Sequence, residues 1–470
     1  MKNRKIKNQV FTALSLLLCS QSNVFANVNE NYSRYCASCH GDKLQGGLGP
    51  NLKDDTWLHG SSEQAIFSAI ENGVLAKGMP AWKGTLSSEE IRAMVVYLQE
   101  RAVDAADSEG HDRVDNKIFK TEDYKVELQS FAVLENSVWA ISFLPDGSLL
   151  TTEKNGHLFI IDKNGTKTQI KNTPNVWLNG QGGLLDVAAH PEYPKQPWIY
   201  LSYADNSFDK DIGMTKIVRG QIIDGTWQKE QVIFSAEQTQ HTSAAVHFGS
   251  RFALHNGYVY FSVGDRGKKE LAQSLANVNG KIYRLYYDGR VPQDNPFAKQ
   301  KSAVSAIWSY GHRNPQGLAI HPVTGKVWST EHGPRGGDEI NLVEKGLNYG
   351  WPVITYGINY NGTPITDKTH QDGMQQPKHY WVPSIATGGI DFYKGSQFGL
   401  WQNNLLVTGM KSEELRRIVI EGTEVTQQEV IFQGRGRVRD VAVSPSGEIY
   451  VAINTGEPKS GQIFRLNRLK

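Results

Sequence analysis

Cysteine is scarce in this chain, with three residues in 470. Two of them, Cys36 and Cys39, share one short motif and the third, Cys19, lies in a leader segment, so no pair remains for a structural disulfide. An excess of charge of one sign is also missing, because 50 lysine and arginine residues face 48 aspartate and glutamate residues, a formal net charge of +2. The composition therefore shows no overall preference for nucleic acid or for a membrane surface.

Membrane-spanning runs are missing too. The apolar run Val10–Cys19 is shorter than the roughly 20 residues that a span requires, and no later segment approaches that length. Basic residues precede this run, and the small residue Ala26 ends the segment, as in a secretory signal peptide. We therefore predict that residues 1–26 are a signal peptide cleaved after Ala26, and that the mature protein is periplasmic without stable membrane insertion. Leu18 stands where a lipid-anchoring signal at Cys19 requires a small residue, which argues against that anchor.

The motif Cys36-Ala37-Ser38-Cys39-His40 is the most informative feature that the chain does contain. Cys-x-x-Cys-His is the site at which haem is attached covalently through two thioethers. A redox dithiol or half of a zinc site are the alternatives, but zinc needs four ligands and a dithiol does not need the adjoining histidine. We therefore predict one covalent haem c on Cys36 and Cys39, with His40 as an iron ligand.

A haem c also needs a sixth ligand, and Met79 in Gly78-Met79-Pro80 lies at a suitable distance along the chain. A thioether ligand there raises the reduction potential. His59 and Met94 are rival ligands. Met94 falls on the apolar stripe of a predicted helix, which indicates a core position, and His59 is expected at the surface. His40 and Met79 are therefore the predicted axial pair.

The chain is long enough for more than one domain. Residues 27–103 are predicted to form a small all-α cytochrome c domain, with one helix near Glu63–Glu71 and a last helix that opens at Ser87 with a capping-type start. The polar, acidic stretch 104–119 is the expected interdomain linker. Residues 120–470 then form the second domain.

That second domain repeats a strand, a tight turn with proline or glycine, and a second strand. Copies occur at 143–150, 319–328 and 441–450, with looser copies at 187–202 and 254–260. One hairpin that recurs over about 350 residues indicates a radial repeat, whereas a β-sandwich seldom repeats one hairpin so often. We predict a multidomain chain: an all-α cytochrome c domain followed by an all-β six-bladed β-propeller.

Function in a propeller lies in the loops at one mouth of its channel. Gly333 and Pro334 offer backbone carbonyls close to Asp338 and Glu339, a donor set that suits Ca²⁺. Cationic side chains come from loops far apart in the sequence, and a planar ligand with several carboxylates would explain them. These cations are Arg313, Lys411, Arg437 and Arg439.

The polar loops 307–317, 331–341 and 348–352 resemble those of the soluble pyrroloquinoline quinone (PQQ)-dependent glucose and aldose sugar dehydrogenases of the sorbosone type, and the resemblance extends over 125–470. It implies PQQ and Ca²⁺ as cofactors. It assigns contacts with PQQ to Asn314, Lys411, Arg437 and Arg439. It assigns the carbonyls of one calcium ion to Gly333 and Pro334, and part of a second calcium site to Glu339 and the Tyr349 carbonyl.

The resemblance also implies catalytic roles for three residues. His247 matches the general base that removes the proton of the anomeric hydroxyl, Gln181 lies by the reacting centre, and Arg313 stabilises negative charge on the quinone oxygen. One departure is that Val246 precedes the base where the glucose enzyme has an aspartate. We expect another group to orient the imidazole, with Asp186 as the candidate.

Together these features predict a quinohaemoprotein that oxidises the C1 hydroxyl of aldose sugars to lactones. Electrons would pass from PQQ to its own haem c and then to an external cytochrome or respiratory acceptor. Two alternatives remain: a calcium-dependent propeller lactonase, and a carbohydrate- or protein-binding propeller whose haem domain serves a separate partner. Only the dehydrogenase should bleach an artificial electron acceptor with sugar after PQQ and Ca²⁺ are added.

Overall fold

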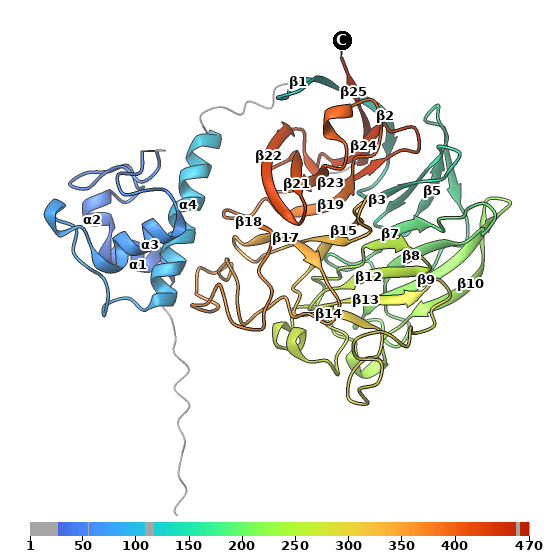
Figure 1. The fold of residues 1–470 in the computed structure, drawn as a ribbon, viewed down its shortest axis with the longest axis horizontal. Helices are drawn as coiled ribbons and strands as arrows, with labels where there is room; N and C mark the ends of the chain where they lie inside the picture. The colour runs from blue at the N-terminus through green and yellow to red at the C-terminus, as the bar shows by residue number, and fades with distance from the viewer. Residues whose placement is uncertain (1–26, 55, 109–116, 457–460, 470) are drawn as a thin grey trace, which may run out of the picture.

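The computed structural model describes residues 27–54, 56–108, 117–456 and 461–469. A small helical domain lies beside a large β domain (Figure 1). The predicted signal peptide, with Cys19, lies outside the described residues. No helix in the described part of the chain has the length and apolarity that a membrane span needs.

The N-terminal domain is helical, as predicted. Ser87 and Glu90 form a reciprocal cap at the start of the longest helix: Glu90 N donates to Ser87 Oγ at 3.2 Å and Ser87 N to Glu90 Oε2 at 3.0 Å. Met94 is 1% exposed in the core of this domain, as its place on the apolar stripe indicates. The helices are α1 (Val28–Tyr35), α2 (Ala37–His40), α3 (Glu63–Asn72), the short 3-10 helix η1 (Leu75–Lys77) and α4 (Ser88–Ser108), which continues past residue 103.

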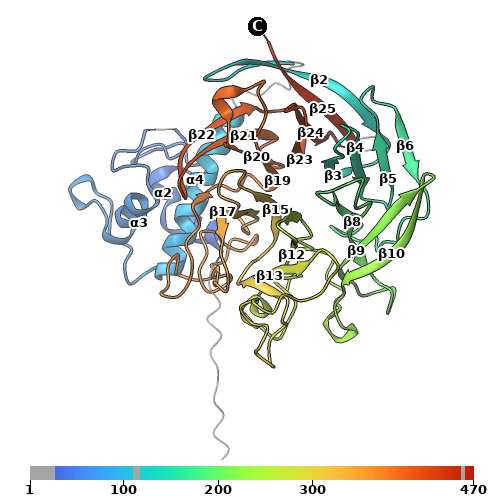
Figure 2. The same ribbon diagram turned by 45° about the vertical axis from the view of Figure 1, so that its right-hand side comes forward.

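The C-terminal domain is the predicted six-bladed β-propeller, and its sheets are arranged around a central axis (Figure 2). Among the residues that the structure describes, five sheets have four antiparallel strands and one has five. The strands of the first three sheets along the chain are β3 (Val138–Phe143), β4 (Leu149–Glu153), β5 (Leu158–Ile161), β6 (Lys167–Ile170), β7 (Leu184–Ala189), β8 (Ile199–Asp205), β9 (Met214–Ile223), β10 (Thr226–Phe234), β11 (Phe252–His255), β12 (Tyr258–Val263), β13 (Lys281–Tyr286) and β14 (Ile307–Tyr310). Those of the other three are β15 (Pro315–Ile320), β16 (Val327–Glu331), β17 (Asp338–Val343), β18 (His379–Trp381), β19 (Thr387–Phe392), β20 (Leu405–Gly409), β21 (Glu414–Glu421), β22 (Glu424–Phe432), β23 (Arg437–Val443), β24 (Ile449–Asn454), β25 (Gly461–Arg468), β1 (Ile118–Lys120) and β2 (Lys125–Leu134). Short 3-10 helices lie in the connections: η2 (Gln238–Gln240), η3 (Lys269–Gln273) and η4 (Gly399–Trp401).

The repeated hairpin has one structural role. All five copies found in the sequence join the first and second strands of a blade: β3–β4, β7–β8, β11–β12, β15–β16 and β23–β24. The first strands of neighbouring blades contact one another, so they are the innermost strands. The sixth pair, β19–β20, has a longer connection over 393–404, which explains why no copy of the motif is visible there.

The ring is closed by strands from both ends of the domain. β2 pairs antiparallel with β25, with Val126 opposite Arg468, and so completes the blade that β23 begins. Apolar side chains fill the spaces within and between the blades, among them the fully buried Trp328, Trp401 and Phe261. This rigid ring fixes the starts of the inner strands relative to one another.

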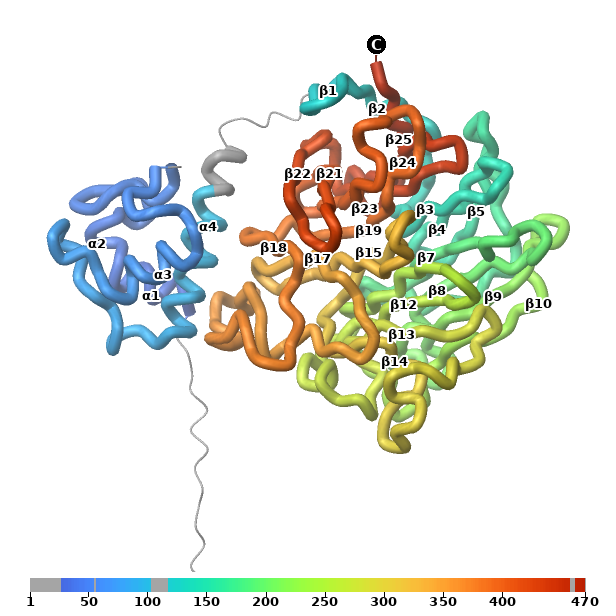
Figure 3. The backbone as a smooth tube through the Cα atoms, viewed as in Figure 1, coloured from blue at the N-terminus to red at the C-terminus, as the bar shows by residue number. Residues whose placement is uncertain are grey.

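The helical domain packs through α4 on the segment that joins β17 to β18 (Figure 3). Arg92 of α4 donates to the Thr355 carbonyl at 3.3 Å, and the backbone N of Val28 donates to the Gly362 carbonyl at 3.1 Å. Ile358 of the propeller is 2% exposed and belongs to the core cluster of the helical domain. The two domains therefore share apolar and polar contacts.

Candidate active site

The predicted site residues of the propeller gather at one end of the ring. Gln181, His247 and Arg313 stand in loops just before inner strands β7, β11 and β15, and Arg437 and Arg439 are at the start of inner strand β23. In an antiparallel blade, the start of the first strand meets the end of the second. The loops after β16 and β20, which hold Gly333 and Lys411, therefore face the same mouth.

His247 is held from two sides. Its ring Nδ1 lies 2.7 Å from Asp265 Oδ1, and its backbone N donates to Gln181 Oε1 at 2.7 Å. Its φ of 52° is in the left-handed region, where a residue with a side chain is held by its surroundings. A Cβ on Gly264 would collide with the carbonyl oxygen of His247, so only glycine permits this close approach. The position of the ring is thus strongly constrained.

The electrostatics around His247 favour a neutral base. Burial lowers the pKa of His247, the hydrogen bond to Asp265 raises it, and the nearby Arg313 and Arg266 lower it, with a net result below the usual value. Burial raises the pKa of Asp265, but hydrogen bonds and charges around it, first of all from His247, bring it below its usual value. Ionised Asp265 accepts a hydrogen bond from the N–H group at Nδ1 of His247. Nε2 of neutral His247 is therefore the nitrogen able to take a proton.

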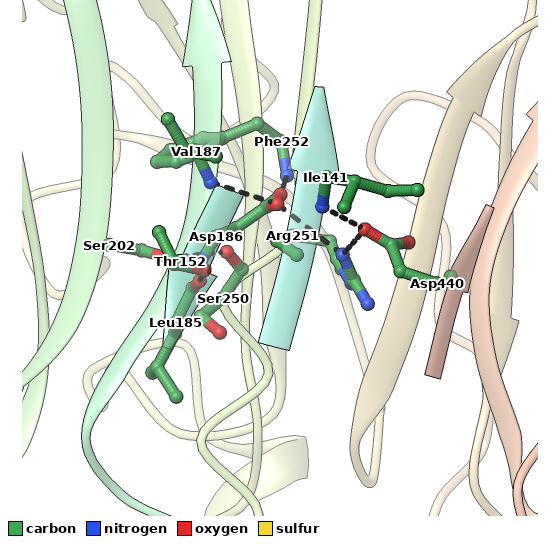
Figure 4. Close-up of polar contacts among 12 residues, drawn as sticks. Ile141, Thr152, Leu185, Asp186, Val187, Ser202, Ser250, Arg251, Phe252 and Asp440 are labelled. Atoms are coloured by element: carbon green, nitrogen blue, oxygen red, sulfur yellow. Dashed lines mark hydrogen bonds and ion pairs between the residues drawn. The ribbon is translucent and has the colours of Figure 1, made fainter. Parts of the chain in front are cut away.

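The expectation that Asp186 orients His247 is wrong. The Asp186 carboxylate is engaged elsewhere: it accepts from the backbone N of Phe252 at 2.7 Å and lies 3.3 Å from Arg251 (Figure 4). Arg251 also lies 3.0 Å from Asp440, and Asp440 accepts from the backbone N of Ile141 at 2.8 Å. This buried group joins inner strands across the axis, and Asp265 has the orienting position instead.

A cavity of about 220 Å³ lies at the mouth of the ring that holds the predicted site residues. Gln181, Asn314, Arg437 and Arg439 line it, which brings four predicted residues together. The other residues of its wall are Ser137, Val138, Trp139, Lys154, Gly180, Phe248, Gln316, His332, Met410 and Asn454. Asn314 Oδ1 accepts from the backbone N of Gly249 at 3.0 Å and from Gln316 at 3.2 Å, which fixes the orientation of its amide.

The polar groups of this cavity are suited to an anionic ligand. Arg439 donates to Met410 Sδ at 3.0 Å and to Gln316 Oε1 at 2.9 Å, and both acceptors are neutral. Burial, with Arg251 nearby, lowers the pKa of Arg439 to about 9, because this cation is costly to bury. His332 Nε2 is buried with no hydrogen-bond partner among the described residues. A polycarboxylate such as PQQ would supply the missing acceptors and negative charge.

The other predicted propeller residues do not line this cavity in the described structure, and His247, Arg313 and Lys411 are among them. Arg313 donates through Nη1 to the Gly333 carbonyl at 2.7 Å and to the His332 carbonyl at 3.1 Å. Calcium on the Gly333 and Pro334 carbonyls would therefore require the guanidinium to move aside. Lys411 instead points to the helical domain, where its Nζ lies 3.3 Å from Glu100 Oε1.

Glu339 and Tyr349 lie in a setting that fits a cation. Glu339 on β17 is directly opposite Glu331 on β16, and like charges in this register repel. Burial, and then the charge of Glu331, raises the pKa of Glu339 to about 8. Asn341 donates to Glu339 at 2.9 Å, while its buried Oδ1 has no partner in the described part of the chain. These oxygens suit Ca²⁺, although no group of three or more His, Cys, Asp or Glu residues placed to hold a metal occurs among the described residues.

The predicted haem motif lies on α2 and the residue before it. His40 Nδ1 lies 2.9 Å from the Pro50 carbonyl, so that Nδ1 carries the proton and Nε2 remains to bind iron. Cys36 and Cys39 are unpaired thiols, and burial raises the pKa of Cys36 to about 11. Met79 is partly buried against the domain core, whereas His59 is exposed. These residues fit a covalently bound haem.

Sequence reasoning missed several residues at the mouth. Asp265 follows His247 by 18 positions with β12 between them, and no local pattern connects the two. Trp351 donates from Nε1 to Asp265 Oδ2 at 2.8 Å, so it is a second support of the carboxylate. Gln316 stands inside the polar loop 307–317 and was visible there, but its contact with Arg439 depends on two different blades.

Known proteins resemble both parts of the chain. The Glucose / Sorbosone dehydrogenase family matches residues 135–465, and the family Cytochrome C oxidase, cbb3-type, subunit III matches residues 23–98. Aldose sugar dehydrogenase YliI of Escherichia coli (strain K12) is 37% identical over 335 residues, which is 70% of this chain and 89% of that protein. Quinoprotein glucose dehydrogenase B of Acinetobacter calcoaceticus is 28% identical over 408 residues, covering 68% of this chain and 84% of its own length.

Solved structures agree with these matches. The apo form of the soluble aldose sugar dehydrogenase from Escherichia coli has a TM-score of 0.68 and 34% identity, covering 73% of this chain and 100% of that one. The PQQ-bound aldose sugar dehydrogenase of Streptomyces coelicolor has a TM-score of 0.60 and 26% identity, covering 73% of this chain and 98% of its own. Over the helical domain, the cbb3-type cytochrome c oxidase subunit FixP of Bradyrhizobium sp. (strain ORS 278) is 43% identical across 70 residues, 14% of this chain and 24% of that protein.

Proposed function

Because the chain belongs to the glucose/sorbosone dehydrogenase family and carries a cytochrome c domain at its N-terminus, we propose that it is a periplasmic quinohaemoprotein. It would oxidise the C1 hydroxyl of aldose sugars to lactones with PQQ and Ca²⁺. Its own haem c would then receive the electrons and pass them to an external cytochrome or respiratory acceptor. The names of the relatives, aldose sugar dehydrogenase and quinoprotein glucose dehydrogenase, support the substrate class and the quinone.

The observation that carries this proposal is the His247–Asp265 pair near a cavity lined by the cations Arg437 and Arg439. In the proposed reaction, Nε2 of neutral His247 takes the proton of the C1 hydroxyl. Asp265 keeps the proton on Nδ1 and stabilises the imidazolium that forms. Trp351 and the backbone N of Gly267 hold the Asp265 carboxylate at 2.8 Å and 2.7 Å, so the pair needs little rearrangement during proton transfer.

Arg437, Arg439 and Asn314 are the residues that would hold PQQ in the cavity, and bound PQQ supplies the two-electron acceptor for the hydrogen on C1. Arg313 would stabilise negative charge at the reacting end of the site. Gly333 and Pro334 would offer carbonyls to one calcium ion once Arg313 has moved. Glu339 and the Tyr349 carbonyl would bind a second, with the Asn341 amide oxygen close by.

Cys36 and Cys39 would carry the haem, with His40 and Met79 as axial ligands, and the haem supplies one-electron transfer. The contacts of α4 with the propeller would keep this acceptor close to the sugar site, which replaces a bimolecular encounter with an intramolecular step.

A steady-state assay tests the proposal against a lactonase and against a binding protein. Purified protein, loaded with PQQ and Ca²⁺, is mixed with an aldose and an artificial electron acceptor, and the acceptor is followed by absorbance. We expect bleaching that requires sugar, PQQ and Ca²⁺ together. Acidification of a lactone without any acceptor would instead identify a lactonase, and sugar binding without either reaction a binding protein.

A further inference from the structure

Glu100 of the helical domain joins two cations of the propeller. Its Oε2 lies 2.6 Å from Arg335 Nε and its Oε1 lies 3.3 Å from Lys411 Nζ. The side chains of Glu100 and Arg335 are 14% and 15% exposed, whereas that of Lys411 is 49% exposed. One contact is therefore short and sheltered, and the other is long and accessible to water.

The direction of Lys411 matters because of its neighbours in the chain. Met410 lines the cavity beside His247, and so do Arg437 and Arg439, but Lys411 is not among the lining residues in the described structure. The backbone N of Lys411 is tied to the Ile385 carbonyl at 2.9 Å, so its position at the mouth is fixed and only its side chain is directed to Glu100. The resemblance to PQQ-dependent dehydrogenases assigns this lysine to a carboxylate of the quinone.

We propose that Glu100 competes with a carboxylate of PQQ for Lys411, so that the haem domain weakens the cofactor site of the propeller. This inference rests on the proposed function. Both competitors are carboxylates, and the compact ammonium group of lysine is attracted to each. When the quinone takes Lys411, Glu100 keeps Arg335 as its partner, so its charge is not left unpaired in the interface.

The size of the effect follows from the exposure of the Lys411 contact. Pairs of this kind contribute little, so removal of the competitor should raise the affinity for PQQ by about two- to five-fold. The coupling is reciprocal: a bound quinone that withdraws Lys411 loosens the contact between the domains by the same factor. The effect should shrink at high salt, because the contact is screened there.

Equilibrium dialysis of the full-length, haem-loaded, PQQ-free protein against PQQ and Ca²⁺, without sugar, measures this affinity directly. The test variant is Glu100→Gln, in which the amide oxygen can still accept from Arg335. The matched control is Glu71→Gln, on α3 of the same domain, where the partner is the exposed Lys83 at 3.7 Å. Both changes are then repeated in a Lys411→Met background. Haem absorbance and thermal unfolding confirm that each variant is folded.

We expect Glu100→Gln to bind PQQ more tightly than the wild type, and Glu71→Gln to bind it with wild-type affinity. In the Lys411→Met background, Glu100→Gln should not change the affinity for PQQ. Equal or weaker binding in Glu100→Gln would overturn the competition, and so would a difference that persists without Lys411. If no protein retains PQQ, wild type included, the proposed function itself fails, and this inference fails with it.

Discussion

Replacement of Asp265 by asparagine should slow sugar oxidation sharply without unfolding the protein. Three donors converge on this carboxylate: His247 Nδ1 at 2.7 Å, the Gly267 backbone N at 2.7 Å and Trp351 Nε1 at 2.8 Å. An asparagine has only one acceptor oxygen, so its NH₂ group must face at least one of these donors. Either orientation therefore damages the support of the base.

The two orientations bound the expected loss. If the NH₂ group faces Trp351, the imidazole keeps its tautomer but loses a buried charged hydrogen bond of about 1.5–3 kcal/mol, or roughly 10- to 100-fold in rate. If it faces His247, the ring must accept at Nδ1 and hold its proton on Nε2, where the base should act. A misplaced tautomer of this kind costs up to about 10,000-fold in a serine protease triad. We therefore expect kcat/KM to fall by at least about 10-fold.

The assay is acceptor reduction by an aldose across pH, with PQQ and Ca²⁺ saturating. Neutral His247 is the active form, so activity should rise with pH through the pKa of His247, which burial holds below its usual value. Asp265 raises this pKa, so the acid limb of the Asp265→Asn profile should move to lower pH. Asp186→Asn is the control and should leave the position of that limb unchanged. A fall of less than about three-fold in Asp265→Asn, or a limb that moves only in Asp186→Asn, would refute the assignment.

Three further predictions concern stability and the two redox centres. Arg251→Met removes the cation that lies between the buried carboxylates of Asp186 and Asp440, so the free energy of unfolding should fall by about 3–5 kcal/mol. The control, Arg290→Met, removes an exposed ion pair and should cost at most about 1 kcal/mol. Equal losses of the two variants in chemical denaturation would contradict the stabilising role of Arg251. The pKa of Glu339 is about 8 in the folded protein, above its unfolded value, so calcium-free protein should lose stability as pH rises from about 4.5 through about 8. Bound Ca²⁺ should remove this loss of stability. The same thermal unfolding profile across pH with Ca²⁺ and with a chelator would exclude the calcium site. Met79→Ala should lower the haem reduction potential in a spectroelectrochemical titration, whereas Met94→Leu should not, and an unchanged potential in Met79→Ala would remove Met79 as the axial ligand.

Local patterns in the sequence were sufficient for most of the fold. The hairpin repeats predicted the propeller because each turn joins residues a few positions apart, and Ser87 with Glu90 predicted the start of α4 for the same reason. Closure of the ring by β2 and β25 joins strands from opposite ends of the domain, which no local pattern specifies.

The site was predictable only where a residue type itself carries the chemistry. Arg437 and Arg439 were found as cations, and the structure brings them to the cavity beside Asn314. Asp265 was missed because its role depends on the turn after β12, which places it against His247, and Asp186 was chosen for its acidity without knowledge of its partner Arg251. Glu100 could not be recognised from the sequence as a site residue, because its ion pair with Lys411 joins two different domains.

The most direct test of the proposed electron transfer is haem reduction by sugar inside one molecule. Protein loaded with PQQ and Ca²⁺ is mixed rapidly with an aldose in the absence of any other acceptor, and the reduced haem α-band is recorded at several protein concentrations. We predict rapid reduction with a rate constant independent of protein concentration, because donor and acceptor share one chain. A band that stays oxidised with every aldose, although dithionite reduces it, would contradict the proposed transfer from the propeller to the haem.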